Sequence, residues 1–232
     1  MRDRNAKKRA RVAGFTRTEM VVIVGVLAVL IGVLFVAIRI GKEQRRRAQC
    51  RTNLRQIGIA LQSYAKDNQD LLPDCTRNNP RFQGAVWPWD MNVDLVSELE
   101  SRGARRQFLY CPSNEMNNDR HWDFPRYSGG HTRVLGYVFL LSGVRDVPHN
   151  LARINLRGDG ARKPDEMELT VDATASQGGD YAHIRGLSVD RSSHMSGDNP
   201  IGGNILFEDG HAAWRPYKQM KHQILTQIKW DF

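Results

Sequence analysis

The sequence lacks the short motifs that mark common enzyme active sites. HExxH, a CxxC pair, GxSxG and a glycine-rich phosphate loop are all absent from its 232 residues. These motifs carry zinc proteolysis, thiolate metal or redox chemistry, serine hydrolysis and nucleotide binding, in that order. We therefore expect a protein that is not an enzyme and that needs no cofactor.

Cysteine is scarce, with only Cys50, Cys75 and Cys111. An odd number leaves at least one thiol free or paired with another chain. A Cys75–Cys111 disulfide would join an irregular loop to the rest of the domain, which suits an oxidising compartment. A Cys50–Cys111 bond and three unpaired thiols are the open alternatives.

Proline is absent from the first 72 residues, so nothing in this stretch breaks a helix. Apolar residues at spacings of three and four, including Leu54, Ile57 and Leu61, predict an amphipathic second half. A helix over residues 16–68 would be roughly 80 Å long. Asn68, which is soon followed by a proline, marks its end.

Long uncharged runs are absent with one exception, Met20 to Ile38, whose nineteen residues are enough to cross a bilayer core. The run is longer than the core of a signal peptide. The fourteen residues at the start of the chain hold six Lys/Arg and one Asp, so more than half of the formal net charge of +9 lies there. Basic residues beside an apolar run are typical of a membrane orientation signal. We expect membrane lipid as a partner and no nucleic acid.

The junction between the basic and apolar segments resembles a type IV prepilin or a type II secretion pseudopilin. The leader ends in Gly14, the mature chain would begin at Phe15, and Glu19 would be its fifth residue. The resemblance implies that a prepilin peptidase cuts after Gly14 and methylates the amine of Phe15. Residues 50–73 also resemble the start of the globular domain in bacterial proteins with a prepilin-type cleavage/methylation domain.

Glu19 needs an explanation, because a carboxylate at the edge of hydrocarbon costs about 2.5–3.5 kcal/mol. The resemblance implies an assembly role, in which Glu19 pairs with the amine of Phe15 on a neighbouring subunit and sets the axial register. The alternative is that Glu19 lies among lipid headgroups without a partner. The sequence departs from the family at Arg17 and Thr18, where apolar residues are usual, and at Val36, where many pilins have proline.

The resemblance implies a basic leader at residues 1–14, a transmembrane and assembly helix at 15–39, and a periplasmic domain at 40–232. The chain would cross the inner membrane once, with its N-terminus cytoplasmic and its C-terminal domain periplasmic, and would then enter a filament. Partners would be the prepilin peptidase, other pilin-like subunits and the inner-membrane assembly platform. The implied function is a structural subunit of a type IV pilus-like or type II secretion pseudopilus filament. The alternative is a membrane-anchored periplasmic binding module or metal-dependent hydrolase that uses the helix only as an anchor.

Apolar patterning in the rest of the chain predicts one short helix, several strands and a tail helix. The helix is at 91–102, the strands are at 134–141, 167–172, 203–208 and 211–216, and the tail helix is at 217–229. Asp209-Gly210 suits a two-residue hairpin turn between the last two strands. We expect an α+β, pilin-like fold, in which one long helix packs on a small antiparallel sheet.

The segment GGNILFEDGHAAW resembles pilin-like proteins with an H-X9-DG domain, although here fourteen residues separate His194 and Asp209. Asp172, His194, Asp209 and His211 are the candidate metal ligands, because aspartate and histidine at the end of a sheet suit Ca²⁺ or Zn²⁺. The hairpin turn and strand alternation explain Asp209 and His211 equally well. Secretion pseudopilins bind calcium in a C-terminal loop, so the resemblance also makes residues 190–199 a candidate site for a structural divalent cation such as calcium.

Overall fold

The computed structural model describes most of the chain after the leader. The described residues are 15–75, 81, 89–114, 119–123, 132–144, 147, 150–157, 160, 162–184, 191–225 and 229–232. Packing divides the chain into two units, Met1–Lys42 and Glu43–Phe232.

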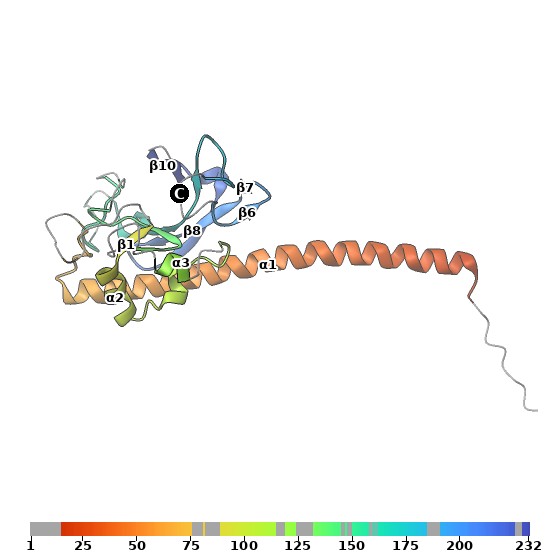
Figure 1. Ribbon diagram of the computed structural model, residues 1–232, viewed down its shortest axis with the longest axis horizontal. Coiled ribbons are helices and arrows are strands. Elements are labelled where there is room, and N and C mark those ends of the chain that lie inside the picture. The colour runs from red at the N-terminus through yellow and green to blue at the C-terminus, as the bar shows by residue number, and fades with distance from the viewer. Residues whose placement is uncertain are drawn as a thin grey trace, which may run out of the picture. The chain divides into compact units, whose positions relative to one another are not determined.

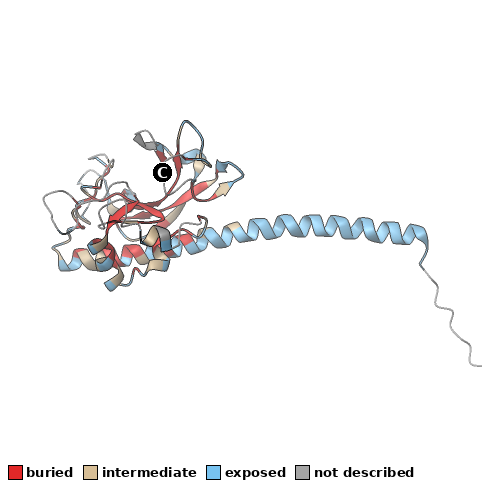
Figure 2. Cartoon of the chain, in the orientation of Figure 1, coloured by how far each residue is buried: buried red, intermediate tan, exposed pale blue. Residues whose placement is uncertain are grey.

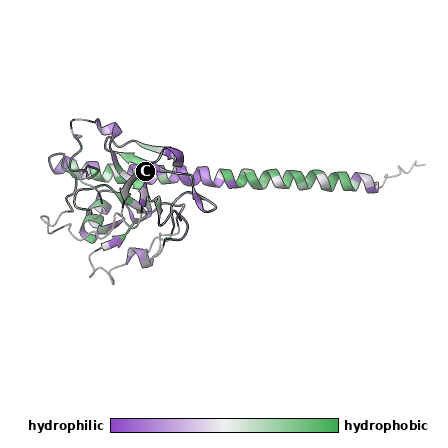
Figure 3. Cartoon of the chain, turned by 90° about the horizontal axis from the view of Figure 1, so that it is seen from above, coloured by the Kyte–Doolittle hydropathy of each residue, from purple (hydrophilic) through white to green (hydrophobic). Residues whose placement is uncertain are grey.

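Helix α1 (Arg17–Asp67) contains the predicted apolar run in its first half (Figure 1). Every residue from 15 to 42 is exposed, and Figure 2 shows this half of α1 in a single colour. Hydropathy colouring marks the same half as strongly apolar (Figure 3). By length and composition, the helix can cross a membrane.

The second half of α1 is amphipathic, as its spacing predicts. Its buried residues are Cys50, Asn53, Leu54, Ile57, Gly58, Ala60, Leu61 and Ala65. Most of them recur every three or four positions, so one face of the helix is covered. Gly58 lies against strand β8 (Gly202–Phe207), because a Cβ atom there would be 2.9 Å from Leu206 Cδ1.

The main sheet has four antiparallel strands in the order β3-β4-β8-β9. Besides β8, they are β3 (Tyr137–Phe139), β4 (Glu168–Asp172) and β9 (Ala212–Pro216). The predicted strands at 167–172, 203–208 and 211–216 are confirmed within a residue or two. With α1 and this sheet, the fold is α+β, as predicted.

The predicted strand at 134–141 is wrong in its extent, because it splits into two. Strand β2 (Thr132–Val134) pairs with β1 (Asp90–Asn92), while β3 pairs with β4. The break falls at Gly136, where an added Cβ would be 2.7 Å from Tyr110 Cα. The chain therefore changes sheets where another backbone passes too close for any side chain.

The predicted tail helix at 217–229 is wrong. A 3-10 turn, η4 (Tyr217–Gln219), is followed by strands β10 (His222–Leu225) and β11 (Lys229–Asp231), which pair with each other. Strand β11 also pairs with β5 (Ala175–Ser176). Distant backbone partners and burial of Trp230 against Trp89, with ring centroids 4.7 Å apart, outweigh the local helical spacing.

The remaining elements are short. They are α2 (Val93–Ser101), η1 (Arg106–Leu109), α3 (Asp119–Trp122), η3 (Pro164–Glu166), β6 (Met195–Ser196) and β7 (Asn199–Pro200). Helix α2 confirms the short helix predicted at 91–102, and the Asn92 side chain caps it by accepting from the Asp94 amide.

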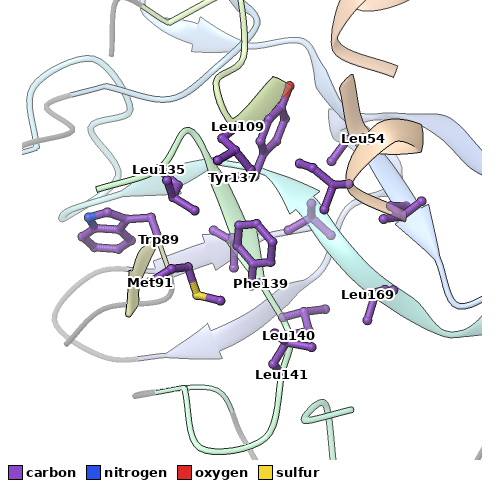
Figure 4. Packing of buried hydrophobic residues seen from close by; sticks show 14 of the residues in the cluster. Leu54, Trp89, Met91, Leu109, Leu135, Tyr137, Phe139, Leu140, Leu141 and Leu169 are labelled. Atoms are coloured by element: carbon purple, nitrogen blue, oxygen red, sulfur yellow. The ribbon is translucent and has the colours of Figure 1, made fainter. Parts of the chain in front are cut away.

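One hydrophobic core lies within unit 2. Figure 4 shows Leu54 of α1 close to the side chains of the sheet, with Tyr137 and Phe139 among them. These three residues are fully buried. The second half of α1 is thus held by the same core that holds the sheet.

Candidate functional site

The predicted processing site lies partly outside the described residues. Gly14 falls outside them, while Phe15 is described and 74% exposed. Cleavage and methylation at these residues remain predictions.

Glu19 has a local partner, Thr16. The Thr16 backbone N–H donates to Glu19 Oε2 at 2.7 Å, and the Glu19 backbone N–H donates to Thr16 Oγ1 at 3.2 Å. This reciprocal pair is a capping box, for which Thr16-x-x-Glu19 is the sequence signature that our reading of the sequence missed. The carboxylate therefore caps its own helix, and its predicted pairing with a neighbouring subunit stays untested.

Unit 2 contains a buried cluster of two thiols, an imidazole and a carboxylate. Its members are Cys50, Cys111, Asp172 and His194, and one ligand atom from each lies within 4.8 Å of all the others. None of the four is more than 2% exposed. Each comes from a different segment: α1, the loop after η1, the end of β4 and the residue before β6.

Short distances join the members of the cluster in a ring. Cys50 Sγ is 2.8 Å from both Cys111 Sγ and Asp172 Oδ1. His194 Nε2 is 3.4 Å from Cys111 Sγ and 3.2 Å from Asp172 Oδ2. Every member thus contacts two others.

Hydrogen bonds from surrounding residues orient Asp172 and His194. Asn204 on β8 donates to Asp172 Oδ2 through its backbone N–H at 2.7 Å and its side-chain amide at 3.0 Å. The Nδ1 atom of His194 lies 2.9 Å from Glu43 Oε1 and 2.8 Å from Ser113 Oγ. The imidazole is therefore oriented with Nε2 facing the cluster.

The loop that carries Cys111 is tied to α1. The Asn53 side-chain amide donates to the Tyr110 carbonyl at 3.0 Å, one turn of helix after Cys50. Tyr137 on β3 places its hydroxyl 3.2 Å from Cys50 Sγ. The two thiols are therefore brought together by contacts between α1, the loop and the main sheet.

His194 has an uncommon backbone conformation, with a φ of 50°. A non-glycine residue in this left-handed region costs on the order of 1–3 kcal/mol, and such residues cluster at functional sites. Its carbonyl accepts from the Ile201 N–H at 3.0 Å, which closes the small hairpin of β6 and β7. The strained backbone directs the imidazole into the cluster.

Electrostatic coupling within the cluster is strong. Burial would lower the pKa of His194, but the Asp172 carboxylate and the hydrogen bonds to the ring raise it to about 12. Burial would raise the pKa of Asp172, and the charge of His194 lowers it below the usual range. Burial raises the pKa of Cys50 well above that of a free thiol, with Cys111 and Asp172 adding to the effect. The histidine and the carboxylate thus form a buried ion pair beside the thiols.

The four predicted metal ligands divide into two pairs. Asp172 and His194 meet in the buried cluster, whereas Asp209 and His211 lie at the β8–β9 turn. There, His211 Nδ1 is 2.6 Å from Asp209 Oδ1 and both side chains are partly exposed. The four candidate ligands are therefore not brought together at one place, and Asp172 and His194 meet Cys50 and Cys111 instead.

The predicted Cys75–Cys111 disulfide is not present, because all three cysteines are free thiols. Cys111 lies against Cys50 instead, which is the alternative pairing. Cys75 is buried elsewhere, with its backbone N–H donating to the Ser142 carbonyl at 2.8 Å. The sequence could not show whether Cys50 or Cys75 lies next to Cys111, because the spacing of cysteines along the chain does not say which segments meet in the fold.

The candidate calcium loop at 190–199 is described from residue 191 onward. There, Met195–Ser196 and Asn199–Pro200 form the two-stranded hairpin of β6 and β7. Asp190 lies outside the described residues, so the loop stays untested as a cation site.

Comparison with known families matches residues 40–108 to the family described as "Protein of unknown function (DUF1559)". No curated protein and no solved structure matches the chain. The match includes the second half of α1 and Cys50 but does not reach the segment that resembles H-X9-DG, which stays a prediction. Together, the match and the apolar N-terminal helix fit a pilin-like protein.

Proposed function

We propose that this chain is a structural subunit of a type IV pilus-like or type II secretion pseudopilus filament. One observation carries the proposal: an uncharged run of nineteen residues, exposed throughout, forms the start of a helix whose second half belongs to a folded domain. Exposed apolar surface on this scale requires lipid or other subunits to cover it. The family matched at residues 40–108 is typical of pilin-like and secretion-associated proteins, which supports the same function.

The proposal includes a sequence of events. Prepilin peptidase cuts after Gly14 and methylates Phe15, with the N-terminus in the cytoplasm. The processed chain stays in the inner membrane with its C-terminal domain in the periplasm until the assembly platform adds it to a filament. The chain does no chemistry of its own.

The burial of the cysteine, histidine and aspartate cluster supports a structural subunit over a hydrolase. A catalytic zinc site keeps one position open to water or substrate. Here four protein groups face one another with at most 2% exposure. The alternative of an anchored metal-dependent hydrolase therefore receives no support from this geometry.

Intact mass and N-terminal analysis of the membrane-extracted chain test the first step. We expect a mature chain that begins with N-methylated Phe15, and we expect a bulky substitution of Gly14 to leave the leader attached. A chain that keeps Met1 in cells with an active prepilin peptidase would overturn the proposal.

Assembly is tested by separating the two roles of Glu19. Glu19→Val removes the carboxylate half of the helix cap and any charge that a neighbour could pair with, whereas Thr16→Val removes the hydroxyl half of the cap and keeps that charge. We expect both variants to insert into the membrane and only Glu19→Val to lose crosslinking between subunits in sheared filaments. If Glu19→Val assembles as well as the parent chain, the anchor hypothesis is favoured over the filament.

A further inference from the structure

We propose that Cys50, Cys111, Asp172 and His194 form a structural zinc site in the folded domain. This inference is independent of filament assembly. It rests on the identity of the ligand atoms, the distances between them, the residues that orient them and the close contacts around Cys50.

The donor set fits zinc. Cysteine sulfur, histidine nitrogen and a carboxylate oxygen are its usual ligands, and structural sites have four of them in a tetrahedron. Two thiolates favour zinc over calcium or magnesium, which take oxygen ligands. Four protein ligands leave no open position, as in sites that stabilise a fold.

The spacing fits after small side-chain movements. With metal–ligand bonds of about 2.0–2.3 Å, ligand atoms in a tetrahedron lie roughly 3.3–3.8 Å apart. His194 Nε2 is already 3.4 Å from Cys111 Sγ. The two sulfur atoms, now 2.8 Å apart, would separate by about 1 Å to hold an ion between them.

Outer partners orient the ligands as they do in known zinc sites. A zinc-binding histidine usually donates its other ring N–H to a carboxylate or a carbonyl. Here Nδ1 of His194 faces Glu43 Oε1 at 2.9 Å while Nε2 faces the cluster. Asn204 holds one oxygen of Asp172 through two hydrogen bonds and leaves Oδ1 directed at Cys50. The Tyr137 hydroxyl, 3.2 Å from Cys50 Sγ, can donate to a thiolate.

Without an ion, close contacts crowd Cys50. Its Sγ atom lies 2.8 Å from both Cys111 Sγ and Asp172 Oδ1, although a thiol is only a weak hydrogen-bond donor. A Cys50–Cys111 disulfide would remove the thiol proton and leave Asp172 Oδ1 facing a sulfur that cannot donate. A divalent cation would release the thiol protons and the Nε2 proton of His194 to solvent, and would bind both sulfurs, the imidazole and the carboxylate together.

The ion would join four segments that are far apart in the sequence. Cys50 and Asp172 alone are 122 positions apart. Because the free energy of metal binding adds to that of folding, the site would hold the second half of α1 to the loop after η1 and to the main sheet.

Metal analysis of the full-length chain, extracted in mild detergent without chelators, tests the proposal. We expect one zinc per chain. After exchange with Co²⁺ alone, we expect a thiolate-to-cobalt charge-transfer band and the intense visible bands of tetrahedral coordination. A chain without zinc that gives neither cobalt signal, or one whose mass shows a Cys50–Cys111 disulfide when it is isolated without reductant, would overturn the proposal.

Cysteine variants provide a matched control. Cys111→Ser is nearly isosteric and should lower zinc affinity by more than about 100-fold, beyond the 10–100-fold loss typical of removing an outer partner. Cys75→Ser changes a buried thiol outside the cluster and should leave zinc content and the cobalt spectrum unchanged. Equal zinc loss in both variants would contradict the proposed ligand set. Equal retention would contradict it as well.

Glu43→Gln tests the outer partner without removing a ligand. We expect zinc affinity to fall by about 10-fold while the cobalt spectrum keeps its thiolate band. An unchanged affinity would show that Glu43 does not orient His194 toward an ion.

Discussion

The two halves of α1 have the same helical backbone and opposite surroundings. From residue 15 to 42 every side chain is exposed, whereas Leu54 and Leu61 in the second half have no exposed surface. The first half contains the uncharged run Met20–Ile38, whereas the second half is rich in charged residues and confines its buried apolar residues to one face. The first half is therefore suited to a surrounding apolar medium and the second to one protein core.

The largest expected difference in stability is between leucine truncations in the two halves of α1. Leu54→Ala should lower the free energy of unfolding by about 2–5 kcal/mol, because it opens a cavity in the core. Leu30→Ala, where the side chain is 58% exposed, should change it by less than about 0.5 kcal/mol. Denaturant unfolding in detergent, followed by tryptophan fluorescence, measures both. If both variants lose the same free energy of unfolding, the two halves of α1 do not differ in how they are packed.

The pH dependence of stability should arise in the second unit, where titratable groups are buried. Burial raises the pKa of Asp90 on β1 to about 7. The folded chain then binds this proton more tightly than the unfolded chain, whose carboxyl has a pKa near 3.9, so stability falls as pH rises from about 4 to about 7.

Asp90→Asn should remove this loss. The variant should be more stable than the parent by about 1–3 kcal/mol at pH 8 and equal to it at pH 4, as measured by thermal unfolding across the range. If the parent chain and Asp90→Asn differ in stability by the same amount at pH 4 and at pH 8, Asp90 is not the titrating group.

Glycines in the two halves give a smaller contrast. Gly58→Ala would place a methyl group 2.9 Å from Leu206 Cδ1, whereas a Cβ added at Gly32 would have nothing within 4 Å. Overpacking costs about 1–3 kcal/mol and alanine regains about 1 kcal/mol of helix propensity, so Gly58→Ala should lose about 1 kcal/mol. Gly32→Ala should lose nothing. Denaturant unfolding in detergent measures both variants. If Gly58→Ala is more stable than the parent chain, Leu206 repacks without cost.

The smallest effect is expected at the start of α1. Thr16→Val removes the hydrogen bond that the Glu19 N–H donates to Thr16 Oγ1. Loss of a cap costs about 1 kcal/mol, which should speed exchange of the Glu19 and Met20 amides by about fivefold. Exchange of the amides of residues 54–61 in the same sample is the control and should not change.

Sequence reasoning succeeded where neighbours in the chain decide the structure. It predicted α1 to within a residue of each end and the β8–β9 hairpin with its Asp209-Gly210 turn. It failed at residues 217–229, where the spacing of apolar residues predicted a helix. Pairing of β11 with β5 and burial of Trp230 decide that segment, and both depend on residues far earlier in the chain.

The sequence by itself determined the long helix, its apolar first half and the amphipathic stripe of its second half, because these follow from residues a few positions apart. Only the tertiary structure decided which cysteine meets Cys111 and which of the candidate ligands come together. Cys50 and His194 reach the same buried point only after the main sheet, the loop after η1 and α1 have packed. No local pattern encodes such a meeting, because its energy comes from burial and hydrogen bonds between segments that are distant in the chain.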